Sequence, residues 1–452
     1  MNLLKPFQKR LLIIASIISL CFFYSCAEDE INNEDVSQQL SEVNLLTTVN
    51  EKNFQPPNEI VTKLGEKYGM KTEEIIESSK SSEKIYSGIT VNIYKVSTQS
   101  PHPDGSGRSI QISGVVLIPK YKDRIVWFKK EKIPYRIRFV TPFTYTSNSS
   151  AASVSYSNIF SIPDEIDQLV PLTMIAQAWT GKFAVFVPDY PGFGDSFGDC
   201  FPPFVNKDAH NRSNYDFLKA GIQQLENMGY ELKDEMLIQG YSQGAFSAIQ
   251  FARYLETNNL KKVKGLSAGG TPALLDNFIL KARSESFHPH PFFFPYAYYG
   301  MKENNLISIG EDRIIQLNKF ASTQQYDNYD QIRALYDGTN SILKLQFSLP
   351  NLPSRLLMSD FINANPNDQN SDYANFFNTL RNNSIQPWNN RCQFRMYHGK
   401  LDNAVYTSQA FEYYQKHKSF GGSVSFDYTL GEHITGYLPF LLKTNDWFWD
   451  LR

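Results

Sequence analysis

Ser242 stands at the centre of a Gly-Tyr-Ser-Gln-Gly pattern, residues 240–244. The apolar run 236–238 comes just before this pattern, and residues at helical spacing follow it from Ala245. A strand, a sharp turn flanked by glycines and a helix form the setting that exposes a serine hydroxyl as a nucleophile, because glycine lets strand and helix approach closely. The stretch therefore predicts a nucleophilic Ser242; a glycine-rich turn without chemistry is the alternative.

A serine hydroxyl attacks only when a histidine takes its proton, and a carboxylate must hold that histidine in the right tautomer. Asp402 and His433 each come shortly after a run that predicts a strand. They follow Ser242 in the order nucleophile, acid, base. We therefore expect Ser242, Asp402 and His433 to form a catalytic triad.

Other interpretations of these residues stay open at this point. Asp402 could be a turn aspartate that accepts local backbone hydrogen bonds, and His433 could cap the last helix. His398 is the main rival for the base, but it precedes the acid and is better placed to order the acid loop.

The oxyanion of an acyl-transfer intermediate needs backbone N–H donors. The N–H of Gln243, directly after the nucleophile, is the first expected donor. The second should come from the loop after the expected strand 135–140, where no His-Gly-Gly motif occurs. Phe143 and Thr144 are the candidates.

The elements that must position these groups alternate between strands and helices, which predicts an α/β fold with a mostly parallel sheet covered by helices on both faces. The runs 85–96 and 110–119 flank a turn and predict an antiparallel hairpin at the sheet edge. A closing helix is expected over 437–450. Further strands are expected near 135–140, 183–188, 236–238, 263–270, 392–397 and 424–428.

The alternation stops over residues 271–386, which include the aromatic cluster 287–299. A segment of this length is too long for an ordinary loop, so we expect a helical lid or cap insertion. It divides the catalytic domain into a first part, 58–270, and a second part, 387–452.

The N-terminus predicts export. Basic residues precede an apolar run, 11–24, that is too short for a membrane-spanning helix, and this is typical of a signal peptide. Cys26 after Ser25 resembles the lipobox of bacterial lipoproteins, so residues 1–26 are expected to form a signal peptide with a lipidated Cys26. A plain secretory signal is the alternative. Residues 27–57 are polar and predict a tether.

Charge and composition exclude some classes of function. The formal net charge is −2, without a long basic run, so no nucleic-acid partner is expected. His288 and His290 lack a third ligand at any recognisable spacing, so no metal site is expected. The loop 189–196 lacks the dinucleotide and phosphate fingerprints. Cys200 and Cys392 could pair or stay free.

Taken together, the Gly-Tyr-Ser-Gln-Gly elbow, the His-Gly-x-x-Asp loop, the late Gly-x-His and the Asp-Tyr-x-Gly-x-Gly loop resemble α/β-hydrolase-fold serine esterases. They are most similar to the secretory-lipase branch, over about residues 85–452. The resemblance implies Ser242, Asp402 and His433 as nucleophile, acid and base, and hydrolysis of carboxylic esters without a metal or other cofactor. It departs after Asp402, where the frequent Val-Pro is missing.

The sequence thus predicts an extracytoplasmic lipase or esterase that acts on a small-molecule or lipid ester, anchored to the outer membrane by its N-terminal lipid or otherwise secreted. One alternative is a serine peptidase of the same fold, which would need acidic residues near the site to bind a free amine. Another is a non-catalytic glycan-binding lipoprotein, against which an intact triad argues.

Overall fold

The computed structural model of the chain describes residues 41–49, 89–121, 134–156, 173–175, 177–178, 181–317, 326–429, 431–434 and 436–451. The predicted signal peptide and the lipidation at Cys26 lie outside these residues, as does most of the predicted tether. Within the described part of the chain, none of the helices has the length and apolar content needed to cross a bilayer.

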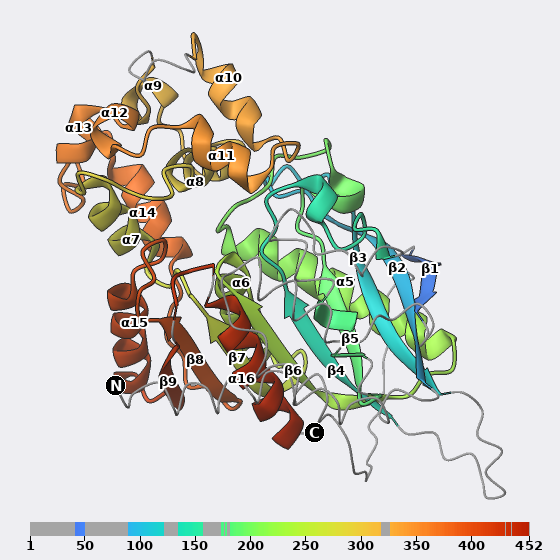
Figure 1. The fold of residues 1–452 in the computed structure, drawn as a ribbon. Coiled ribbons are helices and arrows are strands. Elements are labelled where there is room, and N and C mark those ends of the chain that lie inside the picture. The colour runs from blue at the N-terminus through green and yellow to red at the C-terminus, as the bar shows by residue number, and fades with distance from the viewer. Residues whose placement is uncertain are drawn as a thin grey trace, which may run out of the picture.

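A single nine-stranded sheet organises the molecule, in the order β1-β2-β3-β5-β4-β6-β7-β8-β9 (Figure 1). The strands β4 to β9 run parallel to one another, and β1, β2 and β3 form an antiparallel part at one side. The bounds are β1 Ser41–Val49, β2 Ile89–Pro101, β3 Ser109–Tyr121, β4 Tyr135–Thr141, β5 Phe183–Pro188, β6 Leu232–Tyr241, β7 Lys262–Gly269, β8 Gln393–Gly399 and β9 Val424–Thr429.

The predicted hairpin is confirmed, since β2 and β3 pair antiparallel from Ile89 opposite Tyr121 to Pro101 opposite Ser109. It is not the edge of the sheet, however. Residues 41–49, which lie inside the predicted tether 27–57, form the edge strand β1 on β2. The side chains of β1 are mostly exposed or half-buried, so this strand carries a weak hydrophobic signal and is held mainly by its ladder of backbone hydrogen bonds.

Helices cover both faces of the sheet, as two consecutive residues of β4 show. Arg138 stacks on Phe448 of α16 (Tyr437–Asp450), with the guanidinium carbon 5.0 Å from the ring centre. Phe139 packs instead on Phe217 of α5 (Lys207–Asn227) and Phe251 of α6 (Gln243–Thr257). Because neighbouring strand residues point to opposite faces, α16 lies on one face and α5 with α6 on the other.

Between β7 and β8 the chain forms a run of short helices, which we call the inserted helices (residues 271–386). They gather beyond the ends of β6, β7 and β8, at the upper left of Figure 1. Their bounds are α7 Leu275–Arg283, α8 Phe293–Lys302, α9 Glu311–Ile314, α10 Tyr329–Arg333, α11 Ile342–Ser348, α12 Pro353–Leu356, α13 Ser359–Asn363 and α14 Ala374–Asn383. The helix α15 (Thr407–Ser419) then separates β8 from β9.

Candidate active site

Ser242 occupies the turn between β6 and α6 with φ 57° and ψ −124°. This conformation is rare for a residue with a side chain and costs about 1–3 kcal/mol, so the surrounding structure must hold it. The Ser242 N–H donates to the Gly269 carbonyl at 2.8 Å, which fixes the turn to the neighbouring strand β7.

The two glycines of the pattern are required by close backbone contacts. A Cβ atom at Gly240 would lie 2.0 Å from the carbonyl oxygen of Gly244, and one at Gly244 would lie 2.2 Å from the carbonyl oxygen of Thr141. Both distances are shorter than any van der Waals contact. The sequence pattern thus has a steric cause, because strand β6, helix α6 and the end of β4 meet at this turn.

The structure brings the three predicted triad residues together. His433 Nε2 lies 2.8 Å from Ser242 Oγ, and His433 Nδ1 lies 2.7 Å from Asp402 Oδ2. All three residues are buried. His433 follows β9 and Asp402 follows β8, so parallel strands deliver both side chains to the end of the sheet where Ser242 sits.

Asp402 is held as a carboxylate. Its Oδ1 accepts hydrogen bonds from the backbone N–H of Ala404 at 3.1 Å and of Val405 at 2.8 Å. Burial raises the pKa of Asp402, but the neighbouring His433 and His398 outweigh it and hold the pKa well below its usual range. A charged Asp402 can keep the proton of His433 on Nδ1 and leave Nε2 free to accept one from Ser242.

His398, the rival base, has a different position. Its Nε2 lies 2.8 Å from the carbonyl oxygen of Val405 and 3.3 Å from Asp402 Oδ2. Within the described residues it has no contact with Ser242. The structure therefore places His398 behind the acid, where it orders the loop that follows β8.

Tyr241, which the sequence analysis did not single out, supports the other side of His433. Its hydroxyl donates to the His433 carbonyl oxygen at 2.5 Å. Burial and the negative charge of Asp402 raise the pKa of Tyr241 well above its usual value, so the hydroxyl stays a neutral donor. Its position beside Ser242 in the pattern was the only available signal.

Two of the predicted oxyanion residues, Gln243 and Thr144, are in contact. Gln243 is the first residue of α6, so its backbone N–H has no partner within the helix. Its side-chain Oε1 accepts the backbone N–H of Thr144 at 3.3 Å. Among the described residues, nothing accepts a hydrogen bond from the Phe143 N–H. The structure thus leaves Phe143 available as the second donor, while the amide of Thr144 is already occupied.

No family model and no curated protein matches the sequence. Solved structures do match the fold. A Legionella pneumophila protein provisionally described as a hydrolase has a TM-score of 0.66 at 17% identity, covering 92% of this chain and 98% of that one. The chain has the α/β-hydrolase fold.

Two named enzymes share this fold with the chain. The rice cell wall degrading esterase LipA from Xanthomonas oryzae has a TM-score of 0.65 at 16% identity, covering 91% of this chain and 96% of that chain. Lipase A of Candida antarctica in its closed state has a TM-score of 0.53 at 14% identity, covering 77% and 74%. Because the sequence identities are this low, these comparisons establish the α/β-hydrolase fold but do not identify a substrate.

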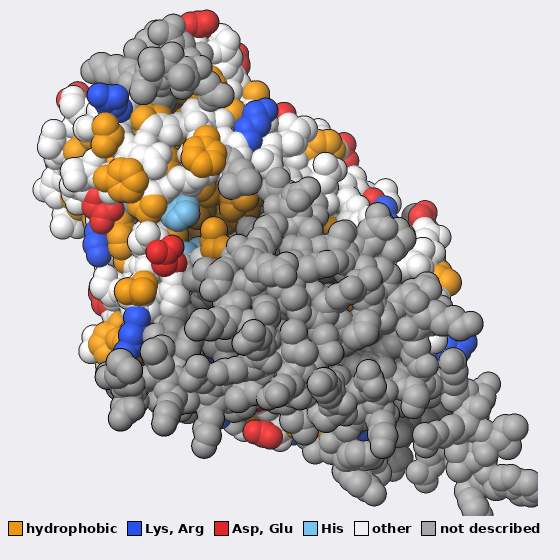
Figure 2. Space-filling view, viewed as in Figure 1, with side chains coloured by type: hydrophobic (Ala, Val, Ile, Leu, Met, Phe, Trp, Pro, Cys, Tyr) orange, Lys and Arg blue, Asp and Glu red, His pale blue; other side chains and the backbone are white. Residues whose placement is uncertain are grey.

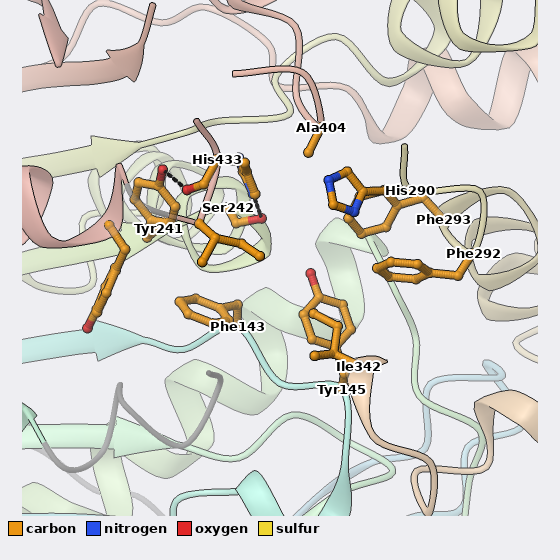
Figure 3. A pocket seen from close by; sticks show the side chains of 12 residues that line it. Phe143, Tyr145, Tyr241, Ser242, His290, Phe292, Phe293, Ile342, Ala404 and His433 are labelled. Carbon is orange, nitrogen blue, oxygen red and sulfur yellow. Dashed lines mark hydrogen bonds between the residues drawn. The ribbon is translucent and has the colours of Figure 1, made fainter. Parts of the chain in front are cut away.

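Two apolar pockets meet at Ser242, with about 420 and about 450 Å³ of empty space that includes open solvent. Ser242 and Phe293 of α8 line both. The His433 pocket, shown in Figure 3, is lined also by Phe143, Tyr145, Tyr241, His290, Phe292, Ile342, Ala404, His433, Ile434 and Tyr437. The Gln243 pocket is lined also by Phe204, Val205, Gln243, Pro272, Leu275, Phe278, Ile279, Ala297, Leu380 and Val405.

The aromatic cluster 287–299 contributes to this site. Phe292, Phe293 and His290 from the cluster line the His433 pocket. Figure 2 shows hydrophobic side chains gathered around a histidine in a hollow on the face of the inserted helices. The cluster also packs the inserted helices internally, since Tyr298 and Tyr299 are fully buried. The cluster therefore both lines the His433 pocket and forms part of the core of the inserted helices.

The His288 and His290 side chains turn to different partners. His288 Nδ1 lies 3.3 Å from Glu285 Oε2, and His290 Nδ1 lies 3.0 Å from Gln346 Oε1. Within the described residues there is no group of three or more metal-ligating side chains. Cys200 and Cys392 are both free thiols.

Proposed function

We propose that the protein hydrolyses carboxylic esters through an acyl-enzyme on Ser242. The observation that carries this proposal is the pair of hydrogen bonds at His433, 2.8 Å to Ser242 Oγ and 2.7 Å to Asp402 Oδ2. A buried, charged aspartate, a histidine and a serine in the strained turn after β6 are the parts that nucleophilic acyl transfer needs.

In the proposed reaction, Ser242 Oγ attacks the ester carbonyl carbon while His433 Nε2 takes the hydroxyl proton. The N–H groups of Gln243 and Phe143 bind the oxyanion. When the tetrahedral intermediate collapses, the carbon–oxygen bond to the alcohol breaks and His433 returns the proton to the alcohol oxygen. Water then attacks the acyl-enzyme by the same route and releases the acid and Ser242.

The apolar linings favour an ester over a peptide as substrate. A peptidase that holds a free amine needs a carboxylate near the serine, and neither described pocket lining includes Asp or Glu. Both pockets are walled in part by the inserted helices, so we propose that these helices act as a cap over the substrate. The esterase and the lipase with the same fold agree with this class of reaction.

The test is hydrolysis of p-nitrophenyl acetate, butyrate and decanoate by the wild type and by Ser242→Ala, with a fluorophosphonate probe on both. We expect turnover and labelling in the wild type and neither in the variant. The chain-length profile then separates an esterase of short acyl groups from a lipase. A folded wild-type protein that neither labels nor turns over would refute the proposed function.

We also propose that the enzyme works outside the cytoplasm, held to the outer membrane by a lipid on Cys26. The support is the basic, apolar and small-residue order of residues 1–26. Cells that express the wild type should incorporate radioactive palmitate into the protein and retain it in the membrane fraction. Cys26→Ser should lose both. Equal labelling of the two would contradict the anchor.

A further inference from the structure

The two pockets at Ser242 can be assigned to the two halves of an ester, an inference that rests on the proposed function. The histidine that took the serine proton must give it to the leaving alcohol oxygen, so the alcohol has to lie beside His433 Nε2. Of the two pockets, only the His433 pocket is lined by this residue. It therefore accepts the alcohol part, and the Gln243 pocket accepts the acyl part.

His290 is a polar group in the otherwise mostly aromatic wall of the His433 pocket. It lies between α7 and α8, and its ring centre is 6.1 Å from that of Phe292 and 6.0 Å from that of Phe293. In Figure 3 a ring nitrogen of His290 points toward the middle of the pocket.

Gln346 of α11 determines which nitrogen of His290 carries the proton. The Gln346 side-chain N–H donates to the carbonyl oxygen of Pro289, so the amide oxygen Oε1 is turned to His290 Nδ1 at 3.0 Å. An amide oxygen can only accept a hydrogen bond, so the network assigns the proton to Nδ1. The other nitrogen, Nε2, then presents a lone pair.

This lone pair is available to a substrate. Among the residues that the structure describes, none forms a hydrogen bond with His290 Nε2. Burial, reinforced by His433, lowers the pKa of His290 to about 4, so the ring is neutral at pH 7. A neutral ring with the proton on Nδ1 is an acceptor at Nε2.

We propose that His290 is a specificity-determining residue that accepts a hydrogen bond from a free hydroxyl on the alcohol part of the ester. The preferred substrates are then partial esters of a diol or polyol, such as a glycerol or sugar monoester. A plain alkyl alcohol would leave the acceptor unpaired, and a site built to bind a hydroxyl discriminates against such an analogue.

The experiment compares glycerol 1-butyrate with propyl butyrate, two soluble esters with the same acyl group and the same number of alcohol carbons. The readout is the ratio of their kcat/KM values. The contribution of the acyl group cancels in this ratio, because both esters are butyrates. We expect a ratio of about five or more in the wild type, the factor that one hydrogen bond typically supplies. A second comparison, of 6-O-butanoylglucose with hexyl butyrate, distinguishes a preference for sugar esters from one for glycerol esters.

Three variants test the assignment to His290. His290→Phe keeps an aromatic ring beside Phe292 and Phe293 but has no acceptor, so the ratio should fall to about one. His290→Gln restores an acceptor and should recover part of the preference. Gln346→Leu leaves His290 in place without the group that fixes its tautomer, so it should lower the ratio in the same direction.

A wild-type ratio near one for both polyol esters, or an unchanged ratio in His290→Phe, would overturn the inference while leaving the proposed function intact. Fluorophosphonate labelling of each variant shows that Ser242 is still in place. Failure of the proposed function has a different signature, in which the wild type cleaves none of the four esters and does not label, and the inference then falls with it.

Discussion

Ser242 shows how strongly a single residue can constrain its neighbours. Its positive φ brings the end of β6 and the start of α6 so close that Gly240 and Gly244 have no room for a side chain. The nearest atoms to these missing side chains belong to the backbone, which cannot rotate away. Substitution at either glycine must therefore move Ser242 itself.

We predict that Gly244→Ala destabilises the protein by about 2 kcal/mol or more and strongly lowers kcat, because its methyl group would clash with the Thr141 and Pro142 carbonyl oxygens and displace the turn that holds Ser242. Urea denaturation and p-nitrophenyl butyrate hydrolysis measure the two effects. Gly229→Ala is the control: φ at Gly229 is 81° and no atom lies within 4 Å of the added Cβ. This control substitution should lower the free energy of unfolding by only about 1 kcal/mol and leave kcat unchanged. Equal effects of the two substitutions would contradict the steric argument.

Mutations of His433 and His398, the two histidines near Asp402, should lower kcat to very different extents. His433→Ala should lower kcat by about 10⁴-fold or more, because no other described side chain reaches Ser242 Oγ to take its proton. His398→Gln should lower kcat by about tenfold at most, because the partners of His398 among the described residues are Asp402, the Val405 carbonyl oxygen and the Phe426 ring. The kcat values of both variants with p-nitrophenyl butyrate test this prediction. A larger loss in His398→Gln than in His433→Ala would indicate that His398 is the base.

At the scale of elements, Gln409 of α15 links this helix to the start of the inserted helices, beside the Gln243 pocket. Its Oε1 accepts the backbone N–H groups of Ala273 and Leu274, both at 2.9 Å, and its Nε2 donates to the Thr271 carbonyl at 2.6 Å. Gln409 thereby holds the start of the inserted helices against the body of the α/β-hydrolase fold. These four residues are buried, so no water can replace the amide.

We predict that Gln409→Leu destabilises the protein by about 2 kcal/mol. The buried Leu274 N–H loses its partner, and the Ala273 N–H and the Thr271 carbonyl keep only the hydrogen bond between them. It should also weaken selectivity for acyl chain length, since Pro272 and Leu275 of the Gln243 pocket flank this link. Urea denaturation and the p-nitrophenyl ester series measure both effects. Lys416→Ala, which breaks an exposed ion pair with Glu412 on the same helix, should change stability by less than about 0.5 kcal/mol. A Gln409→Leu protein as stable as this control would be inconsistent with the link.

On the scale of the whole molecule, buried histidines set the response to acid. Burial lowers the pKa of His210 to about 3 and of His417 to about 4, and it lowers the pKa of His288. Burial raises the pKa of Asp189 and Asp446 to about 6. An unfolded histidine takes up its proton near pH 6.5, so between about pH 4 and 6.5 the unfolded state binds more protons at these histidines.

Stability should therefore fall as pH is lowered from 7 toward 4, since among the described residues these histidines and His290 outnumber Asp189 and Asp446, which act in the opposite direction. The free energy of unfolding measured at intervals of pH checks this. His210→Phe should flatten the slope, because a phenyl ring keeps the stacking on Tyr190, 4.4 Å between ring centres, and takes up no proton. A variant with the wild-type slope would show that His210 does not contribute.

The sequence by itself determined the features that contiguous residues encode. The strand, turn and helix around Ser242, the hairpin of β2 and β3 and the closing helix α16 each lie in one stretch, so local periodicity and glycine placement were enough to predict them. The meeting of Ser242, Asp402 and His433 could also be predicted from the sequence. Each of them follows a predicted strand, and parallel strands place the residues that follow them at the same end of a sheet.

Tertiary structure decided what depends on contacts between distant segments. His398 lies near the end of β8 and His433 follows β9, and only the tertiary structure shows that His433 is the one that meets Ser242. The edge strand β1 was missed because backbone pairing with β2 leaves little trace in its side chains. The two pockets, and the tautomer of His290 that Gln346 fixes, arise from side chains far apart in sequence, which no local pattern records.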